Sequence, residues 1–276
     1  LGCMSFSGVY GAADDDETVD FVRYAIDKGI DFLDSSDMYG WGHNEDVLAR
    51  ALKDGYRDKV VLATKFGIRF NDDMRGGASR AYIMRSVEAS LTRLKTDWID
   101  LYQLHIPDGT TPMEETLRAL DDLVSQGKVR YIGNSNFTAW QMVDADWTAK
   151  ANGLSPFVSC QNEYSLLNRE VDRELLPAMA KYGLGFLPFF PLASGLLTGK
   201  YRRGTNAPEG TRFNKTKMLG DRFMTDENWD TVEALQAFCD ARGHSMLELA
   251  FSWQLANPTV WSVIAGASSP EQVDEN

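Results

Sequence analysis

Hydrophobic and polar positions along this chain fall into two recurring patterns. Short runs of aliphatic, β-branched and aromatic residues, typical of buried strands, are each followed by an amphipathic stretch of helical length. This alternation favours parallel strands joined by helical crossovers. The runs lie near 2–5, 31–34, 60–64, 99–104, 129–134, 158–162, 185–190 and 261–264, and the amphipathic stretches near 15–28, 44–53, 80–94, 112–126, 139–151, 170–182, 226–242 and 246–256.

Capping signals support several of these helices. Thr111, Thr138, Ser245 and Ser269 are each followed three residues later by Glu or Gln, the pattern of a capping box, and the fourth opens a last short helix. Eight strands and eight crossovers predict a closed (β/α)8 TIM barrel of the α/β class, as a single domain over residues 1–276. Because the last helix has barely begun at Asn276, we expect the natural protein to continue there and the chain to be trimmed at both ends.

Five of the predicted strands end on polar residues that a buried strand does not need. These residues are Asp34, Lys65, His105, the pair Ser135 and Asn136, and Gln161. In a closed barrel the carboxyl ends of the strands converge on one mouth, where the chemistry takes place. The sequence therefore predicts one pocket that all of these side chains surround.

Tyr39 lies in a glycine-rich turn five residues beyond Asp34 and adds a phenol to this set. A phenol is a poor acid at its ordinary pKa of about 10, but a neighbouring cation favours its ionised form. Lys65 could supply that cation, Asp34 could keep it charged, and His105 could add a neutral donor. The alternative is a structural ion pair between Asp34 and Lys65 beside an ordinary loop aromatic.

Composition and charge narrow the function. The net charge of -12 argues against binding to nucleic acid or to an anionic membrane, because both need an excess of basic residues. The three cysteines are far apart and form no Cys-x-x-Cys, so we expect reduced thiols in a cytoplasmic protein, with no metal site. No G-x-G-x-x-G follows a strand, so a dinucleotide would have to bind outside the Rossmann mode.

Five segments resemble signatures of the aldo-keto reductase family, in detail its aryl-alcohol-dehydrogenase-like branch, which has relatives among the potassium-channel β subunits. The resemblance implies reversible, NADPH-dependent reduction of an aldehyde or ketone to the alcohol, with a hydride from the nicotinamide. It makes Tyr39 the general acid, Lys65 and Asp34 the groups that tune it, and His105 the group that orients the carbonyl. The segments are 34–40, 63–67, 100–105, 133–137 and 190–201.

The same resemblance implies a cofactor site. Ser135, Asn136 and Gln161 would bind the nicotinamide amide, and Phe189 would stack on its ring. Tyr10 and Trp41 are candidate contacts of the substrate. The other implied cofactor residues are Pro191, Leu192, Ser194, Gly195, Leu196, Lys200, Arg203, Gly266, Ser268, Gln272, Glu275 and Asn276.

A basic segment, residues 199–222, indicates a phosphate site without any appeal to the family resemblance. It carries seven basic residues against two acidic ones and would form the loop after the seventh strand, where barrels often bind phosphate. The alternative is a solvated loop. By the family resemblance, Ser268 and Gln272 would approach a 2′-phosphate, and Glu275 and Asn276 would contact the adenine. NADPH is favoured because helix N-termini and serine hydroxyls bind phosphate. NADH stays an alternative because no arginine stands at the phosphate-facing positions.

Two other functions compete with reductase activity. A regulatory module of the potassium-channel β-subunit type would keep the cofactor site but turn over slowly. An unrelated barrel hydrolase would need clustered histidines or paired carboxylates at strand ends, whereas the three histidines are scattered and the seventh strand ends on Phe189 and Phe190.

Overall fold

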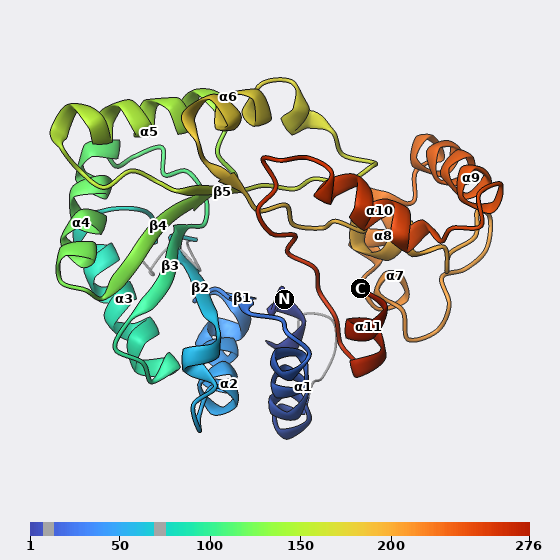
Figure 1. Ribbon diagram of the computed structural model, residues 1–276, viewed down its shortest axis with the longest axis horizontal. Helices are drawn as coiled ribbons and strands as arrows, with labels where there is room; N and C mark the ends of the chain where they lie inside the picture. Colours follow the sequence, from blue (N-terminus) through green and yellow to red (C-terminus); the bar gives the residue numbers. More distant parts are fainter. Residues whose placement is uncertain (8–13, 69–75) are drawn as a thin grey trace.

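The computed structural model of the chain describes residues 1–7, 14–68 and 76–276. Its centre is a parallel sheet that, in these residues, contains six strands in the order β1-β2-β3-β4-β5-β6 (Figure 1). The sequential order confirms the predicted alternation of strands and crossovers. The strands are β1 (Phe32–Asp34), β2 (Val61–Phe66), β3 (Ile99–Leu104), β4 (Val129–Ser135), β5 (Ser159–Gln161) and β6 (Gly185–Phe186).

The register of the sheet brings the strand ends level with one another. Phe66 pairs with Leu104 across β2 and β3, and Ser135 pairs with Gln161 across β4 and β5. Residues that follow these ends therefore emerge at the same edge of the sheet, as the sequence predicts.

Helices cover the outer face of the sheet (Figure 1). In α4, for example, Leu117, Leu120 and Leu123 are fully buried, as expected for one apolar stripe packed on a sheet. The helices of this layer are α1 (Asp15–Asp27), α2 (His43–Ala51), α3 (Arg80–Leu94), α4 (Met113–Ser125), α5 (Ala139–Asn152) and α6 (Leu175–Tyr182).

Two helix starts differ from the prediction. α6 begins at Leu175 rather than near residue 170, because Pro177 has no N–H to donate and its ring would clash with an earlier turn. The expected cap at Thr111 is also wrong: Pro112 precedes α4, and the Thr111 hydroxyl donates to Asp108 at 2.7 Å. The capping boxes at Thr138 and Ser245 are confirmed.

The C-terminal part of the chain lies beside the sheet and returns to its beginning (Figure 1). Asp274 joins the two ends: it forms an ion pair with Lys28 at 2.9 Å and accepts a hydrogen bond from the Tyr24 hydroxyl at 2.8 Å. The helices here are α7 (Arg212–Lys215), α8 (Lys217–Phe223), α9 (Asp226–Asp240), α10 (Met246–Leu255) and α11 (Pro270–Glu275).

Strands predicted at the two margins of the sheet are reduced to single bridges. Gly2 bridges to Asp34, and residues 4–7 form a 3-10 helix, η1 (Met4–Ser7), instead of continuing a strand. Val260 and Ile264 form bridges to Phe186 and Phe189. The described structure is thus a parallel α/β fold with a curled six-stranded sheet, and the eight-stranded barrel stays a prediction.

The strand predicted over 185–190 stops at Phe186 for local reasons. Pro188 cannot donate to a ladder, and Phe190 has a left-handed backbone with a φ of 53°. Phe189 still forms bridges to Glu163 and Ile264, and the chain turns away from the sheet only at Phe190, toward η5 (Ala193–Thr198).

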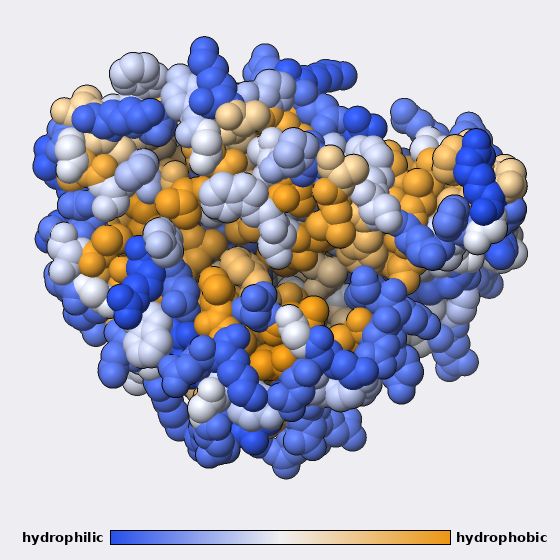
Figure 2. Space-filling model, in the orientation of Figure 1, coloured by the Kyte–Doolittle hydropathy of each residue, from blue (hydrophilic) through white to orange (hydrophobic). Residues whose placement is uncertain are grey.

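The buried core is divided between the sheet–helix layer and the C-terminal helices. Leu33, Leu62 and Ile99 belong to the first cluster, and Leu197 and Phe213 to the second. In the view of Figure 2, apolar surface gathers in a hollow near the centre, and hydrophilic residues surround it. Nowhere in residues 1–7, 14–68 and 76–276 is there a helix with the length and apolar character needed to cross a bilayer.

Candidate active site

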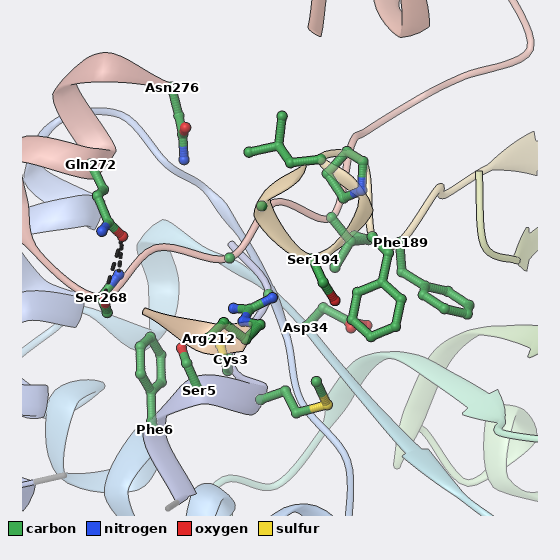
Figure 3. Close-up of a pocket in the computed structure, with 18 of the residues that line it drawn as sticks. Cys3, Ser5, Phe6, Asp34, Phe189, Ser194, Arg212, Ser268, Gln272 and Asn276 are labelled. Carbon is green, nitrogen blue, oxygen red and sulfur yellow. Dashed lines mark hydrogen bonds between the residues drawn. The ribbon is translucent and has the colours of Figure 1, made fainter. Parts of the chain in front are cut away.

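A cavity of about 870 Å³ opens where the strand ends meet. Its walls come from the ends of β1, β4 and β5 and from η1, η5, α7 and α11. Figure 3 shows that the lining residues extend from Asp34 and Phe189 at one end to Gln272 and Asn276 at the other. One elongated cavity therefore connects parts of the sequence that are far apart.

The predicted catalytic residues meet at the β1 end of this cavity. The Lys65 ammonium donates to Asp34 Oδ2 at 2.6 Å and to the Ser35 carbonyl at 2.9 Å, and it lies 3.5 Å from the Tyr39 hydroxyl. The Lys65 and Asp34 side chains are only 1% and 2% exposed. Asp34, Tyr39 and His105 line the cavity, whereas Lys65 supports them from behind its wall.

Two glutamines hold the Asp34 carboxylate in place. Its Oδ1 atom accepts hydrogen bonds from Gln103 Nε2 at 3.1 Å and Gln161 Nε2 at 3.0 Å. Sequence reasoning assigned Gln161 to the cofactor and missed Gln103. The alternation of β3 was the available signal, since positions 103 and 105 share a face and both are polar.

Burial sets the protonation states of this end. Burial raises the pKa of Tyr39, and Lys65 opposes this effect without overcoming it. Burial alone would lower the pKa of Lys65, but Asp34 and Tyr39 raise it further than burial lowers it. Burial and the Lys65 charge hold the pKa of His105 well below its usual range. The site thus presents a protonated phenol, an ammonium and a neutral imidazole, and not the ionised phenol that Lys65 alone would favour.

A left-handed turn aims Tyr39 inward and Trp41 outward. Gly40 and Trp41 have φ values of 55° and 59° within η2 (Tyr39–Gly42). The Tyr39 ring packs edge-on to His105, with centroids 6.1 Å apart. Trp41 is 71% exposed and does not line the cavity, so the structure does not bring this predicted substrate contact to the site. Tyr10, the other one, lies outside the described residues.

Most of the predicted cofactor residues do line the cavity. Leu196 does not, because it is buried in the apolar cluster of the C-terminal helices. Arg203 does not either, because its guanidinium is bound to Asp226 at 2.8 Å and to Asp230 at 2.6 Å on α9. Those that line it are Ser135, Asn136, Gln161, Phe189, Pro191, Leu192, Ser194, Gly195, Lys200, Gly266, Ser268, Gln272, Glu275 and Asn276.

Basic side chains gather at the middle of the cavity. Lys200, Arg212 and Lys215 line it, and in Figure 3 Arg212 lies between the Asp34 end and the Gln272 end. Burial lowers the pKa of Lys200, and the charge of the nearby Arg212 lowers it further. A space lined by such cations suits an anion. Sequence reasoning counted Arg212 and Lys215 in the basic segment but did not single them out, and it selected Arg203 instead.

The α11 end of the cavity presents hydrogen-bonding groups. The Ser268 N–H and hydroxyl both donate to Gln272 Oε1, at 2.9 and 3.2 Å (Figure 3). Ser269 caps α11 by accepting from the Gln272 N–H. This local network holds Ser268 and Gln272 together on the cavity wall, as the sequence predicts.

Known proteins resemble this chain over nearly its whole length. The model of the aldo/keto reductase family matches residues 1–276. A protein of Oryza sativa named probable voltage-gated potassium channel subunit beta is 38% identical over 258 residues, which are 91% of this chain and 77% of that protein. L-glyceraldehyde 3-phosphate reductase of Escherichia coli is 36% identical over 92% of this chain and 76% of its own length. Aldo-keto reductase YhdN of Bacillus subtilis is 36% identical over 99% of this chain and 82% of its own length.

Proposed function

The chain belongs to the aldo/keto reductase family, and from this premise we propose that it is an NADPH-dependent carbonyl reductase. It would convert an aldehyde or ketone to the alcohol and, in reverse, oxidise the alcohol. One observation carries the proposal: a buried Lys65–Asp34 pair stands 3.5 Å from the hydroxyl of Tyr39, at the wall of a large cavity. The family assignment also leaves no support for the barrel hydrolase.

The cavity fits a nicotinamide dinucleotide in its chemistry. Its volume is at the upper end of the range for small-molecule sites, and polar, aromatic and basic groups follow one another along it. Ser135, Asn136 and Gln161 would hold the carboxamide, and Phe189 would face the ring. Lys200, Arg212 and Lys215 would hold the phosphates, Ser268 and Gln272 the 2′-phosphate, and Glu275 and Asn276 the adenine.

When bound, the nicotinamide supplies the hydride for the carbonyl carbon. The protein's own residues act on the carbonyl oxygen, where negative charge develops. Tyr39, which burial keeps protonated, donates its proton to that oxygen. The Lys65 ammonium stabilises the phenolate left behind, and Asp34 keeps the ammonium in place. His105, held neutral, donates a second hydrogen bond that fixes the direction of the carbonyl.

Consumption of NADPH in the presence of an aromatic aldehyde tests this proposal. Wild-type protein should turn over repeatedly, and Tyr39→Phe should lower kcat about 10³-fold because it removes the general acid. The NADPH dissociation constant should change by less than about twofold, since the phenol acts on the substrate oxygen. A wild-type rate in Tyr39→Phe would refute the role of Tyr39, and a tighter dissociation constant for NADH would refute the choice of NADPH.

A second candidate is a cofactor-binding regulatory subunit with slow turnover. The name of the Oryza sativa relative favours it. The complete set of Tyr39, Lys65, Asp34 and His105 favours the enzyme. In the assay above, a regulatory subunit would bind NADPH but consume it only slowly, whereas an enzyme would consume it rapidly.

A further inference from the structure

A buried serine and a buried carboxyl group lie directly behind the imidazole of His105. Ser36 Oγ is 3.0 Å from His105 Nδ1 and 3.4 Å from Asp37 Oδ1. The same oxygen accepts a hydrogen bond from the Met38 N–H at 3.3 Å. Ser36 is fully buried and Asp37 is 6% exposed. The mechanism above uses neither side chain.

The hydrogen atoms available at this contact restrict what His105 can do. A neutral imidazole carries one N–H, and a serine hydroxyl has one hydrogen to donate. If Ser36 donates to Nδ1, the imidazole proton is on Nε2, where it can be donated to a carbonyl oxygen. If Ser36 donates to Asp37 instead, His105 must carry its proton on Nδ1 to bond Ser36, and Nε2 becomes an acceptor that cannot hold a carbonyl.

We propose that Ser36 is a positioning residue that holds His105 in its Nε2–H form, and that a negative charge on Asp37 opposes this by competing for the Ser36 hydrogen. The Ser36–Asp37 contact, at 3.4 Å, is long for a hydrogen bond, which favours donation of the Ser36 hydrogen to Nδ1 and so the productive arrangement. The kinetic consequence rests on the proposed reductase function. The tautomer itself does not, because it is a property of the protein alone.

Asp37 is held where it can compete. Its N–H donates to the Lys65 carbonyl at 3.0 Å, and its Oδ2 accepts from the Ser86 hydroxyl at 3.2 Å. The Lys65 ammonium is turned away, toward Asp34. The other charged or titratable groups that act on Asp37 are Glu45 of α2, Arg93 and Tyr82 of α3, and Tyr102 of β3.

These surroundings make Asp37 change charge near neutral pH. Burial and the Glu45 charge raise the pKa of Asp37 to about 7, against the lowering effects of Ser86 and Arg93. Below that pH the neutral carboxyl group carries its own hydrogen and does not compete for that of Ser36. Above it the carboxylate does compete. The Nε2–H form of His105, and with it the rate of carbonyl reduction, should therefore decline as the pH rises through 7.

Nitrogen NMR of protein labelled with 15N-histidine reads the tautomer directly. The chain has three histidines, so the variants His43→Gln and His244→Gln assign the His105 signals. In wild-type protein at about pH 6, Nδ1 should be a hydrogen-bond acceptor and Nε2 protonated. Raising the pH should shift this pattern in wild type but not in Asp37→Asn, whose amide can donate to Ser36 as the neutral acid does.

Two further variants complete the test. Ser36→Ala should remove the hydrogen-bonded signature of Nδ1. Ser159→Ala is the matched control, because Ser159 is also buried and its hydroxyl has no partner within the described part of the chain. Protonated Nδ1 in wild type at low pH, or an unchanged His105 spectrum in Ser36→Ala, would overturn the proposal. If NADPH consumption is absent while the spectra behave as expected, the proposed function fails and this inference stands.

Kinetics supply the second readout. Ser36→Ala should lower kcat by about tenfold at low pH, the effect of losing one hydrogen bond that orients a catalytic group, and should flatten the decline above pH 7. Asp37→Asn should retain its low-pH kcat at high pH. Identical pH profiles for wild type, Ser36→Ala and Asp37→Asn would contradict the role given to this pair.

Discussion

The β1 end of the cavity and the basic segment are built in different ways. At the β1 end, Lys65 and Asp34 are buried, and each has several hydrogen-bond partners on neighbouring strands. In the basic segment, the side chains of Arg203, Arg222 and Lys217 form ion pairs but are themselves 36%, 51% and 87% exposed. The β1 end of the cavity is thus fixed by the core of the fold, whereas the basic segment lies at the surface and only part of it, including Lys200, Arg212 and Lys215, lines the cavity.

The largest expected difference between the β1 end and the basic segment is the effect of a substitution on stability. Asp34→Ala would leave the Lys65 ammonium buried without a carboxylate, and Gln103 and Gln161 without an acceptor. It should lower the free energy of unfolding by about 3–5 kcal/mol, measured by urea titration. Asp230→Ala, which removes an exposed partner of Arg203, should leave the titration midpoint unchanged within error. Similar losses in both variants would contradict the contrast.

The next contrast is in catalysis. Lys65→Met keeps most of the length of the side chain but removes the charge beside Tyr39. It should lower kcat about 10²- to 10³-fold because the phenolate loses its stabilising cation. Lys217→Met is the control, since Lys217 pairs only with the exposed Asp221 on its own helix among the described residues. Steady-state NADPH oxidation measures both. A rate in Lys65→Met near that of the control would show that the cation has no part in the chemistry.

The pH dependence of stability sharpens the description of the catalytic end. In the folded protein the pKa of Asp37 is raised from 3.8 to about 7, so the folded state binds this proton more tightly than the unfolded chain does. The stabilisation of the fold by protonated Asp37 is fully present below pH 4 and is lost as the pH rises to 7. Wild-type stability should fall by about 3–4 kcal/mol relative to Asp37→Asn over that window. The free energy of unfolding is measured by urea titration at each pH. If it changes with pH in the same way in both proteins, the raised pKa of Asp37 is contradicted.

The smallest expected effect separates the cations of the basic segment. Arg212→Ala should weaken NADPH binding by about tenfold, because Arg212 lines the cavity and would make charge-assisted bonds to a phosphate of the proposed cofactor. Arg203→Ala should change the dissociation constant by less than about twofold, because Arg203 is bound to α9. Calorimetric titration measures both. A larger effect of Arg203 than of Arg212 would reverse the assignment.

The same contrast explains which residues the sequence could predict. Asp34, Lys65 and His105 each end a strand, and parallel strands in register bring such ends together. Pattern and spacing are therefore sufficient to group them. Gln103 could have been found by the same alternation, since it precedes His105 by two positions on β3.

Contacts that depend on loop geometry could not be predicted in this way. The net charge identifies the basic segment in the sequence. The partners of Arg203, however, lie on a helix more than twenty residues later, and only the folded chain shows that these partners hold Arg203 away from the cavity. Trp41 is exposed because the turn before it is left-handed. Ser36 and His105 are 69 residues apart and meet only because β1 and β3 end at the same edge.

Transfer of deuterium tests whether this chain reduces a carbonyl with the nicotinamide hydride. The protein is mixed with an aromatic aldehyde and NADPH in which both hydrogens at the 4-position of the nicotinamide are deuterium, and the alcohol is analysed by mass spectrometry. We expect one deuterium on the carbinol carbon with repeated turnover by wild type, and almost no product with Tyr39→Phe. An alcohol without deuterium, or no NADPH-dependent alcohol at all from wild-type protein, would contradict the reductase assignment.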